Sequence, residues 1–192
     1  MGLEIRYGNI TINRDTFQEI RNRLIDKAEK EGRKWEFSED EVETKIHNDV
    51  YHKYYGQPKV KRCYGLIIEN GQCEPFNFWG CETEDGKIYL PAWLNNIKTA
   101  SITSCGVSGH LRTVEYIDLI YRQLPGMMVE DDTGYFFDRK IENIKNAIRQ
   151  FNKLSSAVAG YMKEDKGADM VLYAIPLLVI GFMFLLARER YF

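Results

Sequence analysis

Apolar and polar residues alternate along several short stretches of the chain, which is the pattern of half-buried β-strands. Residues 3–12 alternate on both sides of a Gly-Asn pair, which predicts a hairpin or a bulged strand. Residues 62–69 and 72–81 are predicted to form a hairpin around Asn70-Gly71, a dipeptide typical of two-residue turns. Further strands are predicted at residues 87–90 and 99–105, and a further hairpin at residues 127–130 and 135–137.

Helical spacing of apolar residues marks four other segments. The first follows a capping-box pattern at residues 16–19 and carries the stripe Phe17, Ile20, Leu24 and Ala28. The second follows a capping-box pattern at residues 38–41 and carries the stripe Val42, Ile46 and Val50. The other two helices are predicted over residues 111–124 and 138–163, with residues 106–109 as a flexible break before the former.

These elements together predict an α+β domain with a mostly antiparallel sheet and three to four packed helices. The last of these helices is amphipathic over residues 141–161. A half-polar stripe of this kind normally packs on the domain's own sheet. The alternatives are a stalk that reaches towards a membrane and a face for homo-oligomerisation.

The C-terminal run departs from this globular pattern. Residues 170–187 contain no charged side chain, and the run passes through Met170, Leu177, Phe184 and Ala187. A helix of this length spans roughly 27 Å, close to the ~30 Å hydrocarbon core of a bilayer. We therefore expect one C-terminal transmembrane helix that contacts the lipid bilayer; a fully buried core helix is the alternative.

The predicted span sets the expected domain organisation. Residues 1–137 form the α+β domain, residues 138–166 an amphipathic helix with a short joint, and residues 167–192 the anchor and tail. The N-terminal residues show no apolar signal segment. These features predict a tail-anchored, single-pass membrane protein with its soluble domain on the cytoplasmic side.

Charge and cysteine content narrow the function classes. The 26 basic and 28 acidic side chains give a formal charge of −2, which carries no signature of nucleic-acid binding. The four cysteines have irregular spacing that does not match zinc-ligand patterns. In a cytoplasmic domain we expect them to be reduced and to act as small buried side chains. No cofactor and no metal are expected from the motifs present.

Candidate catalytic chemistry is limited to one short segment. His110 follows a glycine-rich stretch that also contains Cys105 and Ser108, and a cysteine or serine near a histidine is the pairing of a nucleophile with its base. The simpler interpretation is a loop between a strand and a helix, with Ser108 or His110 near the cap of that helix. Asp131 or Asp132 would supply the carboxylate of such a site, although both lie in a segment typical of turns.

Two functions therefore remain open. The first is a membrane-tethered binding or regulatory protein with an unknown protein partner, for example an immunity-like protein; it predicts an exposed apolar or aromatic patch. The second is a membrane-anchored hydrolase that uses His110 with Cys105 or Ser108; it predicts that these side chains and a carboxylate converge in one pocket.

Overall fold

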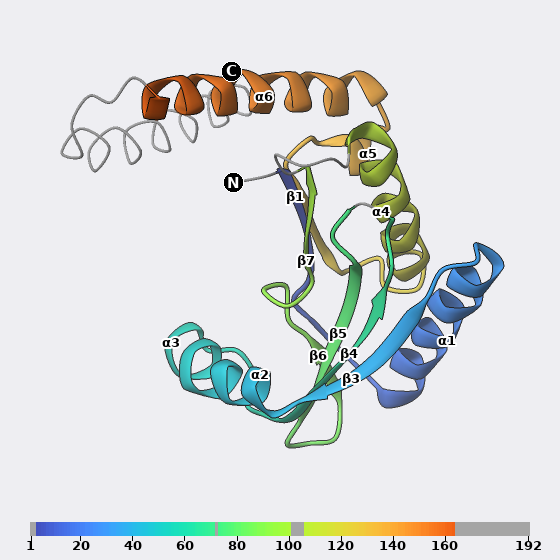
Figure 1. The fold of residues 1–192 in the computed structure, drawn as a ribbon. Helices are drawn as coiled ribbons and strands as arrows, with labels where there is room; N and C mark the ends of the chain where they lie inside the picture. Colours follow the sequence, from blue (N-terminus) through green and yellow to red (C-terminus); the bar gives the residue numbers. More distant parts are fainter. Residues whose placement is uncertain (1–2, 72, 101–105, 164–192) are drawn as a thin grey trace. The chain divides into compact units, whose positions relative to one another are not determined.

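The computed structural model describes residues 3–71, 73–100 and 106–163 of the 192-residue chain. Over these residues the protein is α+β, with two antiparallel sheets and five helical segments, if the continuous run of α2, η1 and α3 (residues 41–55) is counted as one (Figure 1). The chain divides into two compact units, Met1–Arg149 and Gln150–Phe192. The expected α+β class and the antiparallel pairing are confirmed, but the strands form two sheets where one was predicted.

The larger sheet has five strands in the order β2-β6-β5-β4-β3. Their bounds are Ile10–Ile12 for β2, Ile88–Leu90 for β6, Phe76–Thr83 for β5, Val60–Ile68 for β4 and Trp35–Asp40 for β3. The smaller sheet has three strands in the order β7-β1-β8. Their bounds are Asn96–Ala100 for β7, Leu3–Gly8 for β1 and Met128–Asp131 for β8.

The hairpin predicted for residues 3–12 is wrong, because β1 and β2 belong to different sheets. β1 pairs with β7 and β8, whereas β2 pairs with β6. The chain turns from one sheet into the other at Gly8 and Asn9, which have φ of 133° and 53°. A Cβ at Gly8 would lie 2.6 Å from the carbonyl oxygen of Leu90, so this corner requires a glycine.

The β4–β5 pairing is confirmed, with Leu66 opposite Phe78, but the predicted two-residue turn is wrong, because residues 69–75 connect Ile68 to its partner Phe76. β3 was not predicted: it pairs with β4, and Phe37 lies opposite Leu66. The predicted capping box at residues 38–41 is wrong for the same reason. Because Ser38 is part of this strand, the following helix begins three residues later, with Asp40 as its N-cap.

For the helices, the buried side chains were predicted more accurately than the first and last residues. α1 (Arg14–Lys30) buries the stripe predicted for it, but Asn13 caps it in place of Thr16. α4 (Gly106–Tyr121) includes the glycines expected to form a break. The hairpin predicted at residues 127–137 is wrong, because β8 pairs with β1 and α5 (Tyr135–Asp138) is helical. The last helix, α6, spans Ile141–Lys163.

The five-stranded sheet has a large and a small apolar face. Alternate side chains of β4 and β5 point into the main core with α1 and α4, including Leu66 and Phe78. The intervening side chains form a small cluster of Val60, Cys63 and Cys81 on the other face. That face carries a continuous helical run, α2 (Glu41–Ile46), the π-helix η1 (His47–His52) and α3 (Lys53–Tyr55), which we call the arm helix (Figure 1).

The predicted membrane span lies outside the described residues, as does the predicted strand beyond residue 100. Among the described residues, no helix has the length and apolar content needed to cross a bilayer.

Candidate functional site

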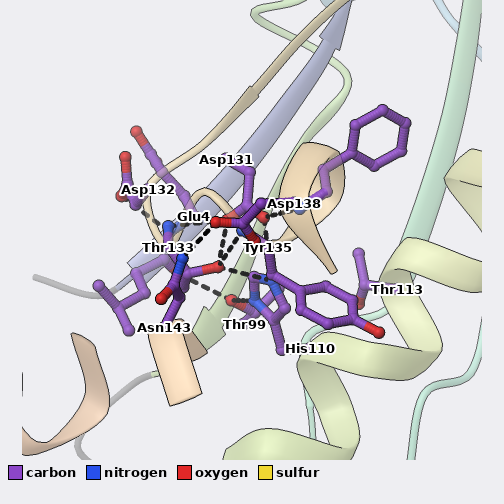
Figure 2. Close-up of polar contacts among 12 residues, drawn as sticks. Glu4, Thr99, His110, Thr113, Asp131, Asp132, Thr133, Tyr135, Asp138 and Asn143 are labelled. Atoms are coloured by element: carbon purple, nitrogen blue, oxygen red, sulfur yellow. Dashed lines mark hydrogen bonds and ion pairs between the residues drawn. The ribbon is translucent and has the colours of Figure 1, made fainter. Parts of the chain in front are cut away.

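His110 lies at the centre of a buried polar cluster that joins α4, β7 and the segment after β8 (Figure 2). Its Nε2 atom is 3.2 Å from Oδ2 of Asp131 and 3.1 Å from Oγ1 of Thr133. Its Nδ1 atom is 2.9 Å from Oγ1 of Thr99. Only 1% of His110 is exposed, and the Asp131 side chain is fully buried.

Asp131 accepts hydrogen bonds at both of its carboxylate oxygens. The backbone N–H and the hydroxyl of Thr133 each donate to Oδ1 at 2.8 Å, and the backbone N–H of Phe136 donates to Oδ2 at 2.8 Å. Burial works to raise the pKa of Asp131, but the hydrogen bond and charge of His110 and these backbone donors outweigh it and hold the pKa below its ordinary value. The carboxylate therefore organises the turn between β8 and α5.

The structure brings His110 together with one of its candidate carboxylates and separates it from one candidate nucleophile. Ser108 is exposed in the first turn of α4, whereas His110 is buried, since residues two apart in a helix face different directions. Cys105 lies outside the described residues. Asp132 accepts a hydrogen bond from the Glu4 backbone and does not reach the ring. Both ring nitrogens of His110 are used within the cluster, which suits a structural role.

Cys63 and Cys81 form a disulfide between opposed residues of β4 and β5. Both are buried as expected, but the expectation of reduced thiols is wrong. Cys73 is disulfide-bonded as well. Disulfides persist in oxidising compartments. The cysteines therefore no longer support a cytoplasmic location.

A second buried histidine, His47, holds the arm helix in place. Its Nε2 atom donates to the carbonyl oxygen of Pro58 at 2.8 Å, and its Nδ1 atom accepts from the indole N–H of Trp93 at 3.3 Å. A carbonyl only accepts and an indole N–H only donates, so the ring is neutral with its proton on Nε2. Burial lowers the pKa of His47; the bond to Pro58 opposes this shift and the charge of His52 adds to it.

The arm helix combines α-helical turns of about 3.6 residues with a π-helical segment of about 4.4 residues per turn. The mean is about four, so residues four apart line up in rows along the helix. One row, which we call the anchor row, consists of Thr44, Asn48 and His52. Asn48 bonds to both backbone groups of Val60, and Thr44 accepts from the backbone N–H of Cys63. Thr44 and Asn48 therefore face the sheet, whereas His52 is exposed and bonds to the carbonyl oxygen of Gln57.

The row on the opposite side, two positions further on, is apolar and faces outward. This outer row consists of Val42, Ile46, Val50 and Tyr54. Their exposed fractions are 65%, 39%, 38% and 69% in chain order. The helix is thus inverted relative to an ordinary amphipathic surface helix, whose apolar side packs on the core.

A charged row flanks the outer row. It consists of Glu41, Lys45, Asp49 and Lys53, whose charges alternate along the helix. None of these four side chains forms an ion pair within the described residues. Glu41 and Lys45 also line an open groove of about 450 Å³ that reaches Lys61, Arg62 and Cys63 of β4.

No group of three or more His, Cys, Asp or Glu side chains in the described part of the chain is arranged to hold a metal ion. Comparisons of the chain with protein-family models, with curated proteins and with solved structures find no match. The function must therefore be argued from the geometry of the chain itself. The sequence revealed the apolar spacing of residues 42, 46 and 50, but it carried no signal that this stripe turns away from the sheet.

Proposed function

We propose that this protein is a membrane-tethered binding protein whose contact surface is the outer row of the arm helix. The observation that carries the proposal is the inverted packing of that helix. Thr44 and Asn48 of its anchor row are bonded to β4, and the four side chains of its apolar outer row are 38% to 69% exposed. Exposed apolar rows of this length are costly unless a partner covers them.

The position of the outer row is fixed before any partner binds. Hydrogen bonds that involve Thr44, His47 and Asn48 attach two successive turns to the segment 58–63. Trp93 stacks on Tyr51 with ring centroids 4.3 Å apart and holds the side of the helix. A surface already ordered in the free protein loses less conformational entropy on binding, which favours a specific contact.

The tether is proposed from the uncharged run of residues 170–187. Confining the domain to a membrane raises its local concentration relative to partners in the same membrane. Proteins that neutralise a toxin by covering it are one class that needs such a face and no catalytic centre. The amphipathic helix of residues 141–161 stays a proposed second surface for self-association.

Photo-crosslinking of the full chain in membranes tests the proposal. A photoreactive amino acid replaces Val50, and a control probe replaces Asn22 on the exposed side of α1. We expect a protein adduct from position 50 and none from position 22. After irradiation, an alkaline wash should leave the full chain in the membrane and release a truncation that ends at residue 166. Equal adducts at the two positions would contradict the binding surface, and release of the full chain would contradict the tether.

A further inference from the structure

We propose that the partner that covers the outer row is a second copy of this chain, with the two arm helices packed antiparallel about a two-fold axis. This inference rests on the proposed function and names the partner of that surface. The surface left open in one copy would then be closed by the identical surface of the other, as in an isologous interface.

The charged row supplies the complementarity that points to self-pairing. When two identical helices pack antiparallel about a two-fold axis, each flanking row meets its own counterpart running in the opposite direction. The order along the row is Glu41, Lys45, Asp49 and Lys53. Antiparallel pairing sets Lys45 beside Asp49 of the partner subunit and Glu41 beside Lys53 of the partner subunit. Every facing pair then has opposite charge.

The same row disfavours the neighbouring registers. If one helix shifts along the other by one turn, Glu41 lies beside Asp49 of the partner subunit and Lys45 lies beside Lys45 of the partner subunit. Like charges then face each other. A parallel arrangement sets the charged row against the row of Glu43, His47, Tyr51 and Tyr55, which contains one carboxylate and no ammonium group, so most of the charges stay unmatched. The alternation of charge therefore favours the antiparallel direction and this register over a slip of one turn.

The favoured register also fits the apolar side chains. The two-fold axis that pairs Lys45 with Asp49 of the partner subunit places Ile46 midway between Ile46 and Val50 of the partner subunit. It places Val42 midway between Val50 and Tyr54 of the partner subunit, so the outer rows interdigitate. The four charges of the row have no ion-pair partner within the described residues of one copy, so pairing breaks no existing ion pair.

Sedimentation equilibrium of the full chain in neutral, density-matched detergent tests the pairing by charge reversal. Lys45→Glu and Asp49→Lys each set like charges together twice in the symmetric interface. We expect each to raise the dimer dissociation constant about tenfold. The double variant restores opposite charges, and we expect its constant to return to within about threefold of the original protein. Both positions are exposed, so neither change disturbs the core.

A double variant that dimerises no more tightly than either single variant would overturn the inference. So would a monomeric original protein. The mass of the adduct from position 50 then separates the two claims. An adduct with a different protein, together with monomeric sedimentation, overturns self-pairing and leaves the binding surface standing. The absence of any adduct overturns both.

Discussion

At the scale of single residues, two buried histidines have different roles in this fold. His110 joins β7, α4 and the turn after β8 through Thr99 and Asp131. His47 joins the arm helix to Pro58 and Trp93. The sequence singled out His110 because glycine, serine and cysteine surround it. His47 received no such weight, because the residues that complete its hydrogen bonds are 11 and 46 positions away.

Acidification is expected to loosen the arm helix through His47. Its folded pKa lies below the ordinary value of about 6.5, so the unfolded chain binds the proton more readily. The contribution of His47 to the free energy of unfolding is therefore fully present above a pH of about 6.5 and is lost as the pH falls below that value. Urea unfolding between pH 8 and 5.5, followed by tryptophan fluorescence, measures this loss.

The matched variant is His47→Gln, whose side-chain amide keeps one donor and one acceptor but does not titrate in this range. It should show a flatter dependence on pH than the original protein. An identical dependence in the two proteins would mean that His47 is not the group responsible.

Replacing Asp131 with asparagine should destabilise the first compact unit by about 2 kcal/mol, because buried N–H donors lose a charged acceptor. The folded pKa of Asp131 is lowered, so its contribution is present above pH of about 4 and is lost as the pH falls through the folded value. Urea unfolding at pH 7 measures the change. Asp26→Asn on the exposed side of α1 is the control, and equal losses in the two variants would contradict this role.

At the scale of elements, the arm helix shows how far sequence patterns reach. The four-residue spacing of its apolar side chains was visible. Its beginning was not, because the pairing of Ser38 with Gly65 in the sheet overrides a local capping pattern. The direction of the stripe was also hidden. It depends on hydrogen bonds from Asn48 to β4, and a helical wheel of the sequence alone contains no such contact.

The position of the helix start can be tested directly. Asp40 accepts hydrogen bonds from the backbone N–H groups of Val42 and Glu43, at 2.7 and 3.1 Å. Asp40→Ala should cost about 1 kcal/mol in local stability of the arm helix. Ser38→Ala should cost less than about 0.5 kcal/mol. Hydrogen exchange of the amides of residues 42–50 provides the comparison, and a larger effect from Ser38 would place the cap where the sequence pattern suggested.

At the scale of the whole molecule, the sequence did not predict which strands pair within each of the two sheets. The period of two identifies strands, but it does not say which strands pair when the chain turns a corner, as it does at Gly8 and Asn9. The stripe of α1 was easier to predict, because it depends on one segment: Phe17, Ile20 and Leu24 are buried as their spacing predicted.

The disulfide gives a whole-molecule prediction about location. In cells lysed directly into denaturant, we expect Cys63 and Cys81 to resist alkylation until a reductant is added, which would indicate an oxidising compartment. The bond closes a loop of 18 residues, so the Cys63→Ser, Cys81→Ser double variant should lose about 3 kcal/mol of unfolding free energy. Alkylation of these cysteines without a reductant would contradict the oxidising location and would support the cytoplasmic location that the sequence predicted.

The central claim is that a partner covers the outer row in the assembled protein. The most direct measurement is the rate at which a water-soluble maleimide labels Val50→Cys in the full chain in native membranes, compared with Asn22→Cys. Covering predicts slow labelling at position 50, and the same rate at both positions once Ile46→Asp is added. Labelling of Val50→Cys as fast as Asn22→Cys without that change would show an open surface and contradict the account.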